Sequence, residues 1–312
     1  MKKQSMDQWL TKMHETDWNS LSPRKRLKLL QELENIMAET QGRKPMKVRP
    51  FPAQVLEKQP GVMGCQNKYG IFINPRYLEG GKTSVLKQNQ YSVAAAINTV
   101  LHEGRHAWQD HVLTHSEAGA NDTTRAILLL NNRAYIRGGA GYSAQFVELD
   151  ARRYARRQYD KMMRRMKELG WEPDPVYIKQ RERDRQSEEA RAAQIKSAFS
   201  EEELALLDIL YRAKIESDVK KFFPNADLSA ILLFEEAKKL VRGEITVDEF
   251  VEGKPMTLTY RDTVEFAEKE KTDALSFEDS FWAALDKPDQ AKPKAEKPDD
   301  ISVRPIGKGS GF

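Results

Sequence analysis

Two histidines and a glutamate form the densest group of residues in this sequence that could do chemistry. They stand in the string His102-Glu103-Gly104-Arg105-His106, an HExxH pattern. Residues four apart lie one above the other on the same face of an α-helix, so the imidazoles of His102 and His106 can reach one metal ion. Glu103 is turned about 100° away from His102, which keeps its carboxylate off the ion but near enough to take a proton from water. The pattern predicts a metal site that activates water.

An HExxH string also arises by chance on a solvated helix, so the neighbouring residues decide between the two interpretations. The stretch before the motif, from Val93 to Leu101, is mostly apolar, which indicates a buried helix. Buried histidines and a buried glutamate are costly unless something binds them, and zinc is the simplest partner. Gly104 costs a helix about 1 kcal/mol relative to alanine. That cost is easier to explain if another element must approach the helix closely there.

A catalytic zinc ion needs a third protein ligand and one open position. His111 and His115 are poor candidates, because His111 lies on another side of the same helix and both would need the helix to end sharply. We favour Glu148, since a carboxylate between the apolar Val147 and Leu149 also needs a partner. The carboxylates considered downstream of the motif are Glu117, Asp122, Glu148 and Asp150.

These residues resemble the zincin metallopeptidases, and specifically the branch in which HExxH is followed on a second helix by Glu-x-x-Ala. The string Glu148-Leu149-Asp150-Ala151 fits that pattern. With a hairpin that ends at Ile73-Asn74-Pro75, the chain from roughly 45 to 160 is similar to the small zincin-like domains of bacterial polymorphic toxins and mobile-element proteins.

The chain also departs from the wider zincin pattern. Arg105 places a charge where zincins usually have an uncharged residue. Gln109 and Val112 stand where the metzincin branch has a glycine and a third histidine, so that branch is set aside.

The resemblance implies a zinc metallopeptidase that acts on a protein or peptide substrate. Its zinc ligands would be His102, His106 and Glu148, and Glu103 would be the general base. Tyr142 or Tyr154 would stabilise the oxyanion, although a tyrosine near a helix start more often serves packing.

Two further roles are expected, the first from the position of Asp150 and the second from the resemblance. Asp150 would orient a ligand histidine from behind, a role that metal-bound imidazoles commonly require, or it would instead cap a helix or form a surface ion pair. The strand Tyr69–Ile73 would run along the cleft and pair with an extended substrate, as sheet edges do with peptides.

The elements that must position these residues can be placed from local patterns. Two short β-type runs, Val62–Cys65 and Tyr69–Ile73, predict a hairpin. Ser92 can cap a helix that runs to about Leu113, and Ala144 to Leu169 predicts a second long helix after a glycine-rich break. A further helix is expected over Thr123–Ile136 and another after the capping box at Ser200–Glu203.

These elements predict an α+β fold with a small antiparallel or mixed sheet beside the metal-binding helix. The expected organisation is a helical N-terminal segment over residues 1–43, a zincin-like domain over 44–170 and a helical region over 171–287. Residues 288–312, which are rich in Lys, Pro, Asp and Gly, are expected to form a disordered tail.

Composition limits the class of protein. The single cysteine, Cys65, excludes an intrachain disulfide and favours a reducing compartment. The start of the chain has no secretory signal, and no apolar run approaches the ~20 residues of a membrane span. We therefore expect a cytoplasmic protein, with delivery by a specialised secretion system left open; its oligomeric state cannot be predicted.

The helix from Arg152 to Lys167 carries many basic residues, which predicts a positive face. The net charge of only +4 does not by itself indicate nucleic acid. The face could bind an anionic partner, or it could be solvated or paired with acidic neighbours. This leaves a second interpretation, a catalytically silent zincin-fold protein of a phage or mobile element that binds protein or nucleic acid. A third is a toxin or effector whose C-terminal part serves delivery.

Overall fold

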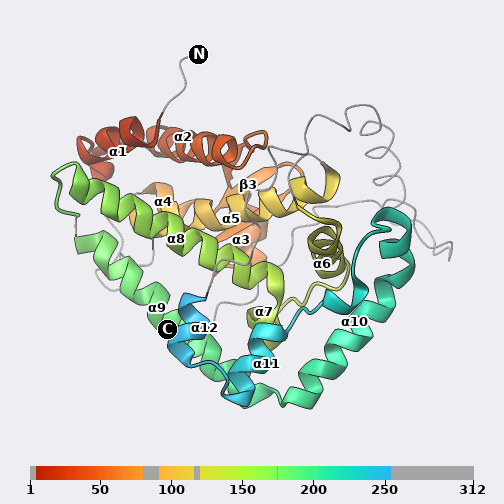
Figure 1. The fold of residues 1–312 in the computed structure, drawn as a ribbon. Helices are drawn as coiled ribbons and strands as arrows, with labels where there is room; N and C mark the ends of the chain where they lie inside the picture. Colours follow the sequence, from red (N-terminus) through yellow and green to blue (C-terminus); the bar gives the residue numbers. More distant parts are fainter. Residues whose placement is uncertain (1–4, 80–90, 116–119, 174, 254–312) are drawn as a thin grey trace.

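The computed structural model describes residues 5–79, 91–115, 120–173 and 175–253 (Figure 1). They form a mostly helical structure with one small mixed sheet, in agreement with the predicted α+β class. The first elements are α1 (Met6–His14), the 3-10 helix η1 (Trp18–Ser20), α2 (Pro23–Thr40), β1 (Val48–Pro50), α3 (Ala53–Lys58), β2 (Gly64–Asn67), β3 (Gly70–Ile73) and α4 (Arg76–Glu79). They are followed by α5 (Val93–Thr114), α6 (Asp122–Arg133), α7 (Gly139–Ala144), α8 (Phe146–Glu168), α9 (Pro175–Ala198), α10 (Glu201–Phe222), η3 (Leu228–Ala230), α11 (Glu235–Arg242) and α12 (Val247–Glu252).

The three strands pair in the order β1-β3-β2, so β3 is the central strand. β2 and β3 form an antiparallel hairpin, as predicted, with Cys65 opposite Phe72. β2 begins two residues after the predicted run Val62–Cys65, because the turn lies at Lys68-Tyr69. β1 lies parallel to β3 on the other side, where the Ile71 amide donates to the Lys47 carbonyl at 3.0 Å. The prediction that strand Tyr69–Ile73 offers a free edge to a substrate is therefore wrong, because β1 occupies that edge. The edge strands are β1 and β2, and β2 is the edge strand that contacts α5.

Helices α5 and α8 lie side by side through the middle of the molecule (Figure 1). α5 begins where the sequence predicted, since the Ser92 hydroxyl accepts a hydrogen bond from the Ala95 amide at 3.1 Å. α8 begins at Phe146, two residues after the predicted start, because the backbone of Gln145 is extended. The buried Gln145 side chain binds both backbone groups of Ile136. α7 forms where the sequence predicted only a flexible break.

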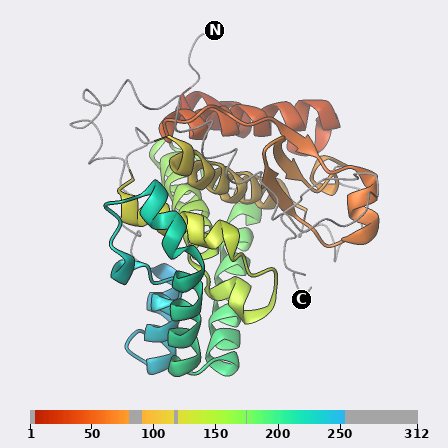
Figure 2. The ribbon, with the colours of Figure 1, turned by 90° about the vertical axis from the view of Figure 1, so that its right-hand side faces the viewer.

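Two hydrophobic clusters meet along these two helices. The first joins α1, α2 and the sheet to the N-terminal half of α5 and the C-terminal half of α8. The second joins α6 and the C-terminal helices to the opposite halves of α5 and α8. Figure 2 shows α10, α11 and α12 gathered away from α1, α2 and the sheet. The middle of α5 and the start of α8 are thus held between two packed cores.

The predicted segments are joined by this packing. Helices α1 and α2, predicted as a separate segment, share the first cluster with the sheet. α9 contributes Tyr177 to the first cluster and Ile195 to the second. The predicted tail, 288–312, and the preceding residues 254–287 lie outside the described residues. Within the described ranges, no helix has both the length and the apolar character needed to cross a membrane.

The basic residues of α8 are used largely inside the molecule. Arg153, Arg156 and Arg157 donate to the carbonyls of Phe250, Glu252 and Gly253 at the end of α12, at 2.7–2.9 Å. These contacts satisfy carbonyls that a helix end leaves without partners. Binding of an anionic partner to this helix stays a prediction, and it now rests on three side chains that are exposed. They are Lys161, Arg164 and Lys167.

A carboxylate between α5 and α9 predicts a pH dependence of stability. Asp184 accepts hydrogen bonds from Asn98 on α5 at 3.2 Å and from Gln180 at 2.8 Å. Burial between the helices raises the pKa of Asp184 to about 6. The unfolded chain, with a pKa near 3.9, releases this proton at lower pH. The contribution of Asp184 to the free energy of unfolding therefore falls as pH rises from about 4 to 6, by up to about 3 kcal/mol, and is constant above that.

Asp184→Asn is expected to remove this pH-dependent decrease in the free energy of unfolding, because the amide carries no charge at any of these pH values. The variant should be more stable than the wild type at pH 7 and close to it at pH 4. Urea unfolding at both pH values measures the difference. The exposed Asp248→Asn is the control and should follow the wild type. A constant difference between the Asp184 variant and the wild type across this range would contradict the assignment.

Candidate metal centre

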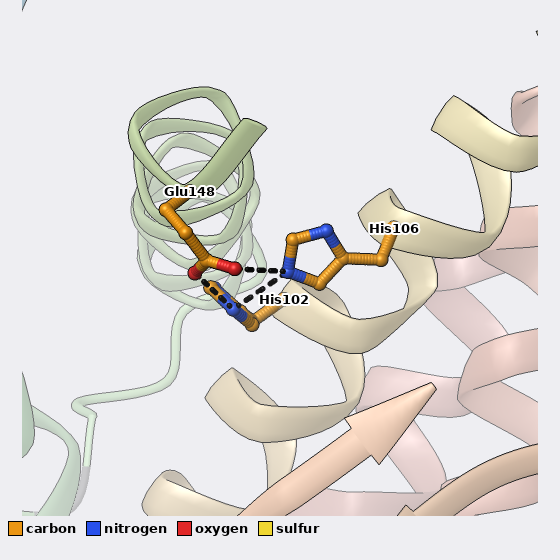
Figure 3. A group of neighbouring side chains, drawn as sticks. All are labelled: His102, His106 and Glu148. Carbon is orange, nitrogen blue, oxygen red and sulfur yellow. Dashed lines mark hydrogen bonds and ion pairs between the residues drawn. The ribbon is translucent and has the colours of Figure 1, made fainter. Parts of the chain in front are cut away.

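Three side chains predicted as ligands from the sequence converge between α5 and α8 (Figure 3). The Nε2 atoms of His102 and His106 are 3.1 Å apart. Glu148 places one carboxylate oxygen 3.5 Å from His102 Nε2 and the other 3.4 Å from His106 Nε2. Ligand atoms on one tetrahedral ion with bonds of about 2.0–2.1 Å lie about 3.3–3.4 Å from each other. The three residues are therefore close enough to hold one metal ion.

The environment of Glu148 fits a cation as well. Its side chain is only 1% exposed. Oε1 accepts a short hydrogen bond from the Tyr135 hydroxyl, whereas Oε2 has no hydrogen-bond partner among the described residues. A buried carboxylate oxygen without a donor is costly, and a divalent ion would remove that cost. Two imidazoles and one carboxylate are a donor set that zinc and related transition metals accept.

The two histidines also govern the ionisation of Glu148. Burial by itself would raise the pKa of the Glu148 carboxyl. The neighbouring imidazoles, that of His106 first, outweigh burial and hold that pKa well below its usual range. Glu148 is consequently a carboxylate, the form in which it can bind a cation.

Gln109 sets the tautomer of His106. The Gln109 amide nitrogen donates to the Val147 carbonyl at 3.0 Å and to Asp150 at 2.8 Å. Its oxygen therefore faces His106 and accepts from Nδ1–H at 2.8 Å. This arrangement leaves the Nε2 lone pair of His106 directed at the centre of the site, as a metal ligand requires. The sequence interpretation used Gln109 only against the metzincin branch and missed this role, although its spacing of three from His106 is a signal.

Asp150 acts on the site through this glutamine. It is 3% exposed and binds the Arg105 guanidinium through two contacts, at 2.7 and 3.0 Å. The arrangement comes closest to the expected role of orienting a candidate ligand histidine. The contact is indirect, because Asp150 binds Gln109 and Gln109 binds His106. Burial would raise the pKa of Asp150, and the Arg105 charge outweighs it, so that the pKa is lowered. The Arg105–Asp150 pair joins α5 to α8 directly beside the ligands.

Gly104 has the close approach that the sequence predicted. A Cβ atom at this position would lie 3.1 Å from a Glu34 oxygen and 3.2 Å from Arg43 Nη2. Arg43 is buried, pairs with Glu34 and donates to the Gly104 carbonyl at 3.0 Å. Because Gly104 has no side chain, the Arg43–Glu34 pair can contact the middle of α5 directly.

A small pocket opens at the three candidate ligands. Glu103 lies in it and is 6% exposed. Gly64 of the edge strand lies against Glu103, since a Cβ at Gly64 would be 2.9 Å from Glu103 Oε1 and 2.4 Å from the Thr99 methyl carbon. His102 is the most exposed of the ligands, with 18% of its side chain accessible. The lining residues are Cys65, Gln66, His102, Glu103, His106, Tyr135, Tyr142 and Glu148.

The structure separates the two tyrosines proposed for the oxyanion. Tyr142 lines the pocket, and its ring lies edge-on to Tyr135 at 6.2 Å. Burial, and then the charge of Glu148, raises the pKa of Tyr142 well above its usual value, so its hydroxyl keeps the proton. Tyr154 lies instead against the Arg105 guanidinium at 4.9 Å and serves packing. Tyr135 was missed from the sequence, because nothing in its local pattern marks it.

The other carboxylates and histidines considered as ligands do not reach the ion position. Asp122 lies 3.7 Å from Arg125 at the start of α6, and Asp150 is paired as described. The rings of His111 and His115 lie tilted against each other, with centres 4.0 Å apart. Glu117 lies outside the described residues.

Comparisons of this chain with protein-family models, with curated proteins and with solved structures found no match. The resemblance to zincins therefore rests on the residues of the sequence alone. What it implies about the metal and the reaction belongs to the proposal that follows.

Proposed function

We propose that this protein is a zinc-dependent hydrolase that cleaves peptide bonds. The observation that carries the proposal is the position of Glu103, which shares one small pocket with the three side chains that can hold a metal ion. Two imidazoles and one carboxylate leave an open position on a four-coordinate ion, which is the arrangement of catalytic zinc sites. Zinc bound there would polarise a carbonyl and lower the pKa of water.

The chain's own residues have distinct roles in this proposal. Glu103 takes the proton from the attacking water and later delivers it to the leaving amine. Tyr142, which keeps its proton, donates a hydrogen bond to the oxyanion that forms from the carbonyl. Tyr135 holds one oxygen of Glu148 in place. A substrate enters beside His102, the most exposed of the three candidate ligands.

The edge strand β2 supports a peptide as the substrate. Ile71 of β3 directs its amide to β1, so by the alternation of an antiparallel pair Cys65 and Asn67 bond to β3. The backbone groups of Gly64 and Gln66 then face the opposite edge, beside the pocket. In this proposal an extended peptide pairs with these backbone groups, as peptides do with sheet edges.

Metal analysis and a cleavage assay test this function together. Purified protein should hold about one zinc ion per chain, and it should cleave a pool of unstructured peptides. Removal of the metal by a chelator should abolish cleavage, and added zinc should restore it. If the protein carries a full complement of zinc and the peptides stay intact, hydrolysis is contradicted and the catalytically silent binding protein is favoured. Salt-sensitive binding to DNA or RNA would then support that second interpretation.

A further inference from the structure

One guanidinium lies behind Glu148, between two carboxylates. Arg152 follows Glu148 by one turn of α8, and its side chain is 10% exposed. Its Nε lies 3.0 Å from a carboxylate oxygen of Glu188 on α9. Its Nη2 donates to the Ser143 carbonyl at 2.6 Å. Its Nη1 ends 3.9 Å from Oε2 of Glu148.

Arg152 and Glu148 are therefore near each other but form no hydrogen bond. Nη1 and Oε2 are both buried, and neither has a hydrogen-bond partner within the described part of the chain. A buried guanidinium and carboxylate normally close to about 2.7–2.9 Å, because charge-assisted hydrogen bonds are strong where water is excluded. The contacts with Glu188 and Ser143 hold the guanidinium by its other two nitrogens. They leave Oε2 of Glu148 without a protein donor.

We infer that Glu188 is a positioning residue that keeps Arg152 off Glu148, so that this carboxylate stays available to a metal ion. A closed pair would place a fixed positive charge where the ion must bind and would compete with it for the same oxygen. Glu188 also pairs with Arg191 one turn along α9, which fixes it in turn. The C-terminal helical region is thereby part of the metal site. This inference rests on the metal site of the proposed function and not on its hydrolytic chemistry.

The test measures zinc affinity by competition with a chromophoric chelator. Glu188→Gln keeps the shape of the side chain but removes the charge that restrains Arg152. We expect zinc affinity to fall about 10- to 100-fold, the range found when partners of metal ligands are removed. Adding Arg152→Met to Glu188→Gln removes the competing guanidinium and should recover most of the loss.

The matched control is Glu236→Gln. Glu236 pairs with Arg153, the next residue of α8, at 3.4 Å, and so also joins α8 to the C-terminal helices. Its replacement should leave zinc affinity unchanged. Thermal melts of the zinc-free proteins show that each variant is folded.

Unchanged zinc affinity in folded Glu188→Gln would overturn the inference. Failure of Arg152→Met to recover the affinity would do so too, because the loss would then come from loosening of α9. A wild-type protein that binds zinc and cleaves nothing would defeat the proposed function without touching this inference. A wild-type protein that binds no zinc would overturn both.

Discussion

Replacing Glu148 by alanine is expected to lower zinc affinity by about a hundredfold or more. Structural zinc sites gain about 10–16 kcal/mol from four ligands, so one ligand accounts for roughly 3 kcal/mol. Glu148 is the only carboxylate among the described residues that reaches both imidazoles. Its loss leaves His102 and His106, which are adjacent on one helix and cannot surround an ion. Chelator competition measures the affinity, and cleavage should fall with zinc occupancy.

Asp122→Asn is the matched control for this prediction. Asp122 was also a candidate ligand from the sequence, but the structure places it beside Arg125 at the start of α6. Its replacement should leave zinc affinity unchanged. Zinc binding by Glu148→Ala as tight as that of the wild type would show that the three side chains do not form the site.

Replacing Glu103 by glutamine is expected to separate metal binding from chemistry. The amide has the shape of the carboxylate and can fit beside Gly64, but it cannot accept the proton from the attacking water. General-base catalysis contributes about 10²–10⁴-fold, so kcat should fall by that factor while zinc content stays at the wild-type level. Zinc analysis and peptide cleavage on the same preparation measure both quantities.

Two results would contradict this role for Glu103. Turnover at the wild-type rate would show that another group accepts the proton. If Glu103→Gln loses zinc as well as cleavage, Glu103 is needed for metal binding and its role as the general base is contradicted.

Arg105 shows how a departure from a family pattern can have a structural cause. From the sequence, it was a charge on an apolar helix and counted against the resemblance. In the structure, its guanidinium binds Asp150 through two contacts and lies 3.7 Å from the centre of the Trp108 ring. Both charges are buried and paired, so removal of either partner would leave the other uncompensated. The residue that departs from the pattern forms a buried ion pair between α5 and α8, the helices that carry the three candidate ligands.

The largest error from the sequence concerns the sheet. The hairpin was predictable because two short β-type runs flank a turn. The partner of β3 on its other side was not, because β1 is only three residues long and contains Pro50. Its pairing depends on contact between segments more than twenty residues apart, and no local pattern reports such a contact. The strand expected to face a substrate is consequently internal, and β2 takes that position.

The sequence by itself determined the two long helices, the hairpin and the close group of His102, His106 and Glu148. The histidine spacing and the helix cap are local properties of a few neighbouring residues, and the apolar neighbours of Glu148 indicated its burial. Only the tertiary structure decided which groups surround those ligands. The Tyr135–Glu148 hydrogen bond and the Arg105–Asp150 and Arg152–Glu188 ion pairs arise where separate elements pack together. Such contacts depend on the register between helices, which the packing of two hydrophobic clusters sets.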